Sequence, residues 1–219
     1  MYLISYGIAD ILARFIILFL AITVHEFAHG MAAYKLGDPT AKYEGRLTLN
    51  PLSHMDPIGA VCMVLFRFGW AKPVPINPMY FRDRKRDTAI TAAAGPLSNI
   101  LMAFISAVLI APFMILIKPN FSNVITYFIE KLLYECAYLN IYFAAFNLIP
   151  FPPLDGSKIL GAFLSQENYM QLLQYERFAY PLLIIFMISG LLSRVLSIII
   201  TPLISLWTMF ANGLISIIG

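Results

Sequence analysis

Long apolar runs separated by short polar segments dominate this chain. Three of them, at residues 8–33, 88–117 and 124–149, are long enough to cross a bilayer as helices, which takes about 20 residues. Two more, at 179–192 and 195–217, are separated only by Ser193 and Arg194 and predict a C-terminal helical hairpin over residues 178–217. The pattern predicts an all-α polytopic membrane protein with about five to six transmembrane helices.

The region between the first two runs has a different character. Gly37-Asp38-Pro39 is typical of a helix end, and residues 46–50 alternate polar and apolar side chains, which favours a short strand. Residues 58–70 are apolar but short for a full crossing, and Arg67 interrupts them, so a re-entrant segment is expected, with a full crossing as the alternative.

Basic residues give the expected orientation. They cluster at 82–86 and again just after the first run, at Lys35, Lys42 and Arg46, and such clusters mark cytoplasmic loops. A re-entrant 58–70 segment keeps both groups on the same side. The N-terminus is then expected outside and the C-terminus inside.

Composition agrees with a membrane location. Hydrophobic residues make up 60% of the chain and charged residues 12%, which excludes an ordinary soluble domain. The net charge of +3 resides in basic residues beside the apolar runs, so no nucleic acid partner is expected. Cys62 and Cys136 lie in apolar stretches and are expected to be small core residues. Asp10 and Arg14, four residues apart in the first run, are expected to pair with each other.

The first apolar run ends in a metal-binding pattern, His25-Glu26-Phe27-Ala28-His29. On a helix the two histidines lie one turn apart on the same face, where both can bind one zinc ion. Glu26 is adjacent and can take a proton from a water molecule. The alternative is that both histidines only pack, but three ionisable side chains inside an apolar helix are costly and usually functional.

A catalytic zinc site needs a third protein ligand, and Asp155 is the strongest candidate. It ends an apolar run, follows Pro150, Pro152 and Pro153, and precedes Gly156. The prolines hold the backbone extended, which is tolerated at membrane depth only where the backbone lines a cavity or packs on protein. The alternative role for Asp155 is to cap a short helix that begins near Gly156.

Together, these motifs resemble the site-2 protease family of intramembrane zinc metalloproteases. That family pairs H-E-x-x-H with a later N-x-x-P-x-x-P-L-D-G-type motif, matched here by residues 147–156, and Gly95-Pro96-x-x-Asn99 resembles its middle-span motif. Residues 45–59 and 68–75 resemble the compact prokaryotic branch without PDZ or CBS domains. The resemblance extends over about residues 20–165.

The resemblance implies hydrolysis of a peptide bond in or near a transmembrane helix of a membrane-protein substrate. His25, His29 and Asp155 would bind one Zn²⁺ per chain, Glu26 would be the general base, and no organic cofactor would be needed. It implies one integral membrane protease domain over 1–219 with a catalytic core at about 8–165. It also implies a prokaryotic plasma membrane with the active site toward the cytoplasm.

The sequence leaves the roles of three polar residues open. His54 is a candidate gate, transition-state donor or extra ligand, or else structural. Asn99 and Asn147 line the substrate cleft if the resemblance holds, or only satisfy a neighbouring helix. The strand expected at 46–50 would pair with an unwound substrate. The competing functions are a membrane zinc transporter or metal-binding receptor, and a catalytically inactive relative.

Overall fold

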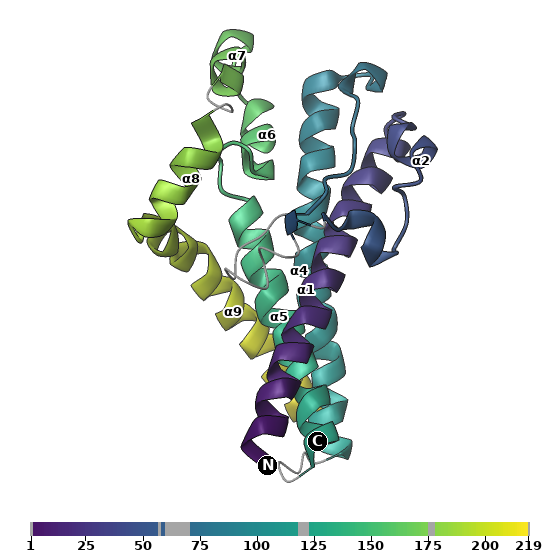
Figure 1. The fold of residues 1–219 in the computed structure, drawn as a ribbon, viewed down its shortest axis with the longest axis vertical. Coiled ribbons are helices and arrows are strands. Elements are labelled where there is room, and N and C mark those ends of the chain that lie inside the picture. The colour runs from purple at the N-terminus through teal and green to yellow at the C-terminus, as the bar shows by residue number, and fades with distance from the viewer. Residues whose placement is uncertain (1, 57, 60–70, 118–122, 175–177, 219) are drawn as a thin grey trace. The chain divides into compact units, whose positions relative to one another are not determined.

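Helices make up almost all of the regular structure. The computed structural model describes residues 2–56, 58–59, 71–117, 123–174 and 178–218 (Figure 1). Its elements are α1 (Tyr2–Lys35), α2 (Thr40–Tyr43), η1 (Pro51–His54), η2 (Pro78–Tyr80), α4 (Arg84–Leu116), α5 (Val124–Asn147), α6 (Asp155–Gly161), α7 (Gln166–Gln174), α8 (Ala179–Ile188) and α9 (Leu191–Ile218). The described residues contain no sheet, and a single antiparallel bridge joins Met55 and Ala71. The all-α class is confirmed.

Three described helices are long and apolar enough to cross a membrane, namely Gly7–Lys35 within α1, α4 and α9. Helix α5 has 24 residues but carries Glu130, Lys131 and Glu135. Helix α8 has ten residues, a length of about 15 Å at 1.5 Å per residue, and the hydrocarbon core is about 30 Å thick. The count of five to six spans stays a prediction.

The strand expected at residues 46–50 is not present. A strand needs a hydrogen-bonded neighbour, and this segment instead leaves α2 through a tight turn in which the Arg46 N–H donates to the Ala41 carbonyl at 2.8 Å. The Arg46 side chain is buried and donates to the Lys72 carbonyl at 2.8 Å. The alternation of polar and apolar side chains in residues 46–50 therefore predicted a strand wrongly. Most of the expected re-entrant stretch, residues 60–70, lies outside the described residues.

The turn between the last two helices also lies at a different position from the one expected. Residues 189 and 190 separate α8 from α9, with Gly190 at φ +72°, whereas Ser193 and Arg194 lie inside α9. A positive φ costs least at glycine, so Gly190 sets the turn.

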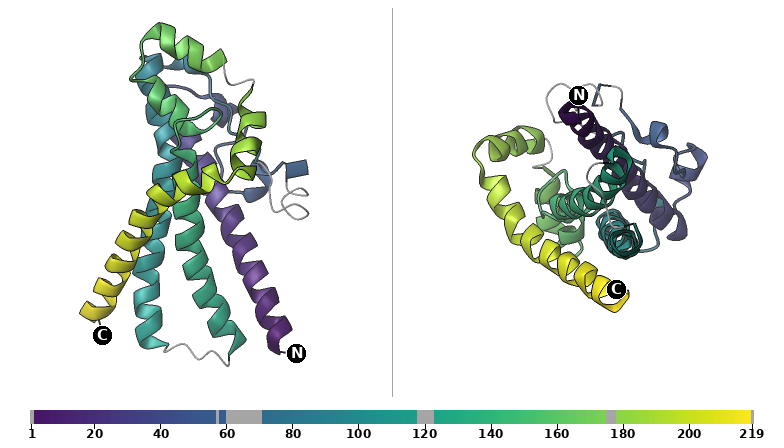
Figure 2. Two further views of the ribbon diagram at one scale, coloured as in Figure 1. Left: turned by 90° about the vertical axis from the view of Figure 1, so that its left-hand side faces the viewer. Right: turned by 90° about the horizontal axis from the view of Figure 1, so that it is seen from below.

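The described chain divides into two compact units, and the first contains residues 1–21, 99–146 and 189–219. Its core combines alanines and isoleucines of α4 and α5 with Trp207 and Ala211 of α9. The Trp207 indole N–H donates to the Ala103 carbonyl at 2.8 Å. Figure 2 shows α4 and α5 side by side in this unit. On α1, one face is buried at every fourth residue: Ala9, Ala13, Ile17 and Ala21. Small side chains let membrane helices approach closely, so backbone packing stabilises the unit.

Charged side chains in the first unit pair between helices. The Arg14 guanidinium bonds the Glu135 carboxylate at 3.1 Å, and Lys131 lies 3.4 Å from the same carboxylate. Asp10 accepts a hydrogen bond from the Tyr127 hydroxyl at 2.7 Å. Lys131 also lies 3.8 Å from the Asp10 carboxylate. The expected Asp10–Arg14 pair is therefore wrong, because each residue has an oppositely charged partner on α5. Cys136 is a buried free thiol, as expected, and Cys62 lies outside the described residues.

The second unit contains residues 22–98 and 147–188, and a buried carboxylate organises its polar loops. Helix α1 ends as expected at Gly37, with φ +106°, and the Asp38 N–H returns to the Ala33 carbonyl at 2.9 Å. The Asp38 carboxylate then accepts the Thr40 N–H at 3.0 Å and the Asn77 N–H at 2.7 Å. The segment at 71–78 is thereby fixed to the end of α1.

Candidate metal centre

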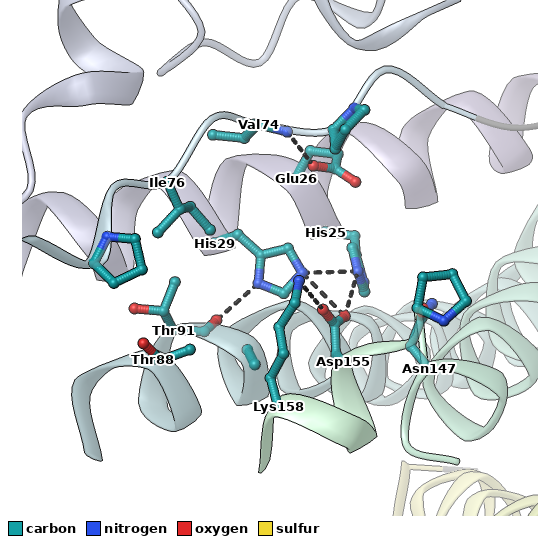
Figure 3. Close-up of a pocket in the computed structure, with 14 residues that line it drawn as sticks. His25, Glu26, His29, Val74, Ile76, Thr88, Thr91, Asn147, Asp155 and Lys158 are labelled. Carbon is teal, nitrogen blue, oxygen red and sulfur yellow. Dashed lines mark hydrogen bonds and ion pairs between the residues drawn. The ribbon is translucent and has the colours of Figure 1, made fainter. Parts of the chain in front are cut away.

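Three side chains in the second unit converge on one point. The Nε2 atoms of His25 and His29 lie 3.0 Å apart, and each lies 3.1 Å from Oδ2 of Asp155 (Figure 3). All three residues are buried. These are the three residues that the sequence predicted as zinc ligands. The structure brings them together although His25 and Asp155 are 130 residues apart in the chain.

Local structure explains how each ligand arrives. His25 and His29 are four residues apart on α1, so their rings project from the same face and meet edge to face at 4.5 Å. Asp155 is the first residue of α6, after an extended Leu154 with φ −70° and ψ 156°. Leu154 therefore occupies the capping position, and the Asp155 carboxylate faces the histidines. In the loop before it, the Phe151 ring packs on Phe186 of α8 at 5.4 Å.

The donor set fits a zinc ion. Ligands about 2.0–2.1 Å from a tetrahedral zinc lie about 3.3 Å from one another, close to the 3.0–3.1 Å separations here. The His29 Nδ1–H donates to the Thr91 carbonyl at 2.7 Å, which orients the ring so that Nε2 faces the other two candidate ligand atoms. Burial alone would raise the pKa of the Asp155 carboxyl, but its hydrogen bonds and charge interactions with His25 and His29 hold that pKa below its usual range. The carboxyl is therefore a carboxylate, the form that binds a metal.

Glu26 lies in the same cavity as the three candidate ligands. Its Oε2 accepts the Val74 N–H at 2.8 Å, so the extended segment between Pro73 and Pro75 orients the carboxylate (Figure 3). The cavity has a volume of about 290 Å³. It is lined by His25, Glu26, His29, Pro73, Val74, Ile76, Pro78, Thr88, Thr91, Ala92, Asn147, Pro153, Asp155 and Lys158. The Glu26 carboxylate and a candidate metal site therefore face one space.

Glycines allow the backbone to approach the ligands closely. A Cβ at Gly95 would lie 2.4 Å from Nε2 of His29 and 2.7 Å from Cε1 of His25, so α4 can contact both rings only with glycine there. A Cβ at Gly156 would lie 2.4 Å from the carbonyl oxygens of Leu148 and Ile149. These contacts explain the glycines of two motifs that the sequence analysis identified.

The other predicted polar residues lie in different places. Asn147 lines the cavity. His54 is fully buried in η1, where its Nε2 lies 2.8 Å from the Thr48 carbonyl, and it does not line the described cavity. Asn99 belongs to the first unit, where its amide donates to the Ala21 carbonyl at 3.1 Å and to Asn140 at 2.8 Å.

Sequence reasoning missed three residues of the site. Val74 and Thr91 act through backbone groups, which every residue carries, so side-chain identity gave no signal. Lys158 follows Asp155 by three residues on α6, and its Nζ lies 3.8 Å from Oδ1 of Asp155. Helical spacing from Asp155 was the signal that would have identified it.

The proteins and the protein family that this chain resembles are consistent with a zinc site. Residues 111–190, which include Asp155, match Peptidase family M50. The chain is 35% identical over 184 residues to the "Putative zinc metalloprotease YwhC" of Bacillus subtilis, covering 83% of this chain and 82% of that protein. It is 25% identical to the "Putative zinc metalloprotease Rip2" of Mycolicibacterium smegmatis, over 80% of this chain and 66% of that protein. It is 30% identical to the "Zinc metalloprotease MJ0392" of Methanocaldococcus jannaschii, over 86% of this chain and 46% of that protein. No solved structure matches the chain.

Proposed function

The chain belongs to peptidase family M50, and on that premise we propose that it is a zinc-dependent intramembrane endopeptidase. Its reaction is hydrolysis of a peptide bond within or beside a transmembrane helix of a membrane protein. The observation that carries the proposal is the buried His25, His29 and Asp155 cluster, which shares a cavity with Glu26. Both histidines lie on a helix apolar enough to cross a membrane, which supports a substrate that is itself a transmembrane helix.

The proposed ligands are His25, His29 and Asp155, which together supply two imidazoles and a carboxylate to one Zn²⁺. When bound, zinc polarises a peptide carbonyl and lowers the pKa of water at its open position. Thr91 holds His29 in the required tautomer through the Nδ1–H bond.

Glu26 is the proposed general base. Its carboxylate takes a proton from the attacking water and returns that proton to the amide nitrogen as the C–N bond breaks. The Val74 N–H holds one carboxylate oxygen and leaves the other for the proton. We propose that Asn147, which lines the same cavity, binds the extended substrate backbone through its side-chain amide. The bonds of Asn99 and His54 support packing roles for those two residues.

The proposed setting is regulated intramembrane proteolysis at a prokaryotic plasma membrane, in a multi-pass chain with the site toward the cytoplasm. The basic residues Arg82, Arg84, Lys85 and Arg86 at the start of α4 support that orientation.

The deciding experiment compares the wild type with Glu26→Gln in liposomes that contain single-span reporter proteins, with zinc measured on the same samples. We expect cleavage by the wild type alone and about one zinc per chain in both, because the amide keeps the size of the carboxylate but cannot accept the proton. Glu44→Gln, at an exposed glutamate of the same charge, is the matched control and should cleave normally. Equal cleavage by wild type and Glu26→Gln would remove Glu26 from the mechanism. Absence of zinc from the wild type would refute the proposal as a whole.

A further inference from the structure

Lys158 places a positive charge at the edge of the catalytic cavity. It lies on α6 three residues after Asp155, so both side chains project from one face of the helix. Its Nζ is 3.8 Å from Oδ1 of Asp155, and its side chain is 43% exposed (Figure 3). The ammonium therefore belongs to the cavity rather than to the packed interior.

The contact with Asp155 does not occupy the ammonium. A separation of 3.8 Å is an ion pair but exceeds hydrogen-bond length, and the other carboxylate oxygen, Oδ2, already lies 3.1 Å from each histidine. Asp155 is thus positioned by His25 and His29 together with the start of α6. An ammonium has three N–H donors, and those of Lys158 remain available to an acceptor in the cavity.

Charge balance indicates what that acceptor is. Among the described residues that line the cavity, Glu26 and Asp155 are carboxylates and Lys158 is the one lysine or arginine. Hydrolysis of a peptide bond moves negative charge onto the carbonyl oxygen, and donors aimed at that oxygen lower the barrier most when they carry a positive charge. The neutral side-chain donors of the same lining are the Asn147 amide and the Thr88 and Thr91 hydroxyls, and a neutral donor stabilises a developing negative charge less than an ammonium does.

We propose that Lys158 is a catalytic residue that donates a hydrogen bond to the carbonyl oxygen of the scissile peptide as that oxygen becomes negative. This inference rests on the proposed peptidase function. As water adds to the carbonyl carbon, the C=O electron pair moves to oxygen and Glu26 takes the proton. When the pair returns, the C–N bond breaks and the same proton goes to nitrogen. Lys158 stays protonated throughout and contributes only charge and a donor.

The test uses the full-length, zinc-loaded protein with two readouts, cleavage of a single-span reporter and binding of a phosphinic pseudopeptide of alanine residues. The phosphinate group is anionic and tetrahedral, so it mimics the charged oxygen without requiring turnover. The variants are Lys158→Ala and Lys158→Arg. Lys42→Ala is the control, because Lys42 is an exposed lysine outside the cavity that bonds the Tyr34 hydroxyl.

For Lys158→Ala we expect kcat to fall about 100-fold, as for other oxyanion donors, with KM nearly unchanged. Phosphinate affinity should fall by a similar factor, and zinc content should not change. Lys158→Arg should recover most of both, because guanidinium keeps the charge and the donors.

Three results would overturn the proposal. Loss of zinc in Lys158→Ala would make Lys158 a positioning residue that acts through Asp155, and a change in KM alone would make it a substrate-binding residue. Equal phosphinate affinity in wild type and Lys158→Ala would exclude contact with the anion. If the wild type cleaves no reporter, the proposed function fails separately, and phosphinate binding still decides whether Lys158 contacts the anionic oxygen.

Discussion

The substitution Gly95→Ala tests the geometry of the metal centre through a residue that binds nothing itself. Gly95 lies on α4 against the rings of His25 and His29, and an added Cβ would lie 2.4 Å from Nε2 of His29. Real Cβ atoms almost never approach closer than 3.0 Å. The change therefore forces either the imidazoles or the α4 backbone to move.

The size of that movement predicts the effect. From 2.4 Å to 3.0 Å the shift is at least 0.6 Å, which exceeds the roughly 0.2 Å tolerance of metal–ligand distances. The His29 ring cannot turn away without stretching its 2.7 Å bond to the Thr91 carbonyl. Loss of such a supporting bond typically lowers metal affinity about 10- to 100-fold, or about 1.4–2.8 kcal/mol. Overpacking should also lower the free energy of unfolding by about 1–3 kcal/mol.

The assay is zinc competition with a fluorescent chelator, with thermal unfolding measured in the same detergent. Gly213→Ala is the matched control: it lies in α9, where an added Cβ meets nothing within 4 Å, so zinc affinity should not change and helix propensity should slightly raise the melting temperature. If Gly95→Ala binds zinc as tightly as the wild type, the close approach of α4 to the histidines is refuted.

Two further substitutions separate catalysis from stability. Val74→Pro removes the N–H that donates to Glu26 at 2.8 Å, so kcat should fall about 10-fold or more with zinc content unchanged; unchanged kcat would show that this bond does not orient the base. Glu135→Gln removes the charge that pairs with Arg14 and Lys131, so thermal stability should fall by about 1 kcal/mol or less, because Arg14 is 64% exposed, while zinc affinity stays the same. A change in zinc affinity in the second variant would contradict a purely structural role for that ion pair.

The metal-binding pattern was readable from the sequence because helical periodicity fixes local geometry. Once residues 8–33 were assigned to a helix, the spacing of His25 and His29 placed both rings on one face, as the structure shows. Asp155 was predicted on chemical grounds, since a third ligand was required and its Pro-rich surroundings excluded a regular helix before it. The structure brings its Oδ2 within 3.1 Å of both histidines.

Other expectations failed because they depended on partners far along the chain. Asp10 and Arg14 have the spacing of a helical ion pair, but α5 offers Tyr127 and Glu135 to them. Residues 46–50 have strand-like alternation, yet a strand requires a neighbouring strand, and the buried Arg46 instead bonds the Lys72 carbonyl. Spacing within a segment does not identify which distant segment lies beside it.

By itself the sequence determined the helical, membrane-embedded character of the protein, the candidate metal-binding face of α1 and the side-chain chemistry of the candidate third ligand. Each of these follows from apolar run length, residue period or side-chain type, all of which are local properties. Only the tertiary structure decided that Thr91 fixes His29, that Val74 holds Glu26 and that Gly95 must lack a side chain. The first two roles depend on backbone groups, and the third depends on the absence of a Cβ. Long-range packing brings these positions to the site, and residue type alone does not predict that packing.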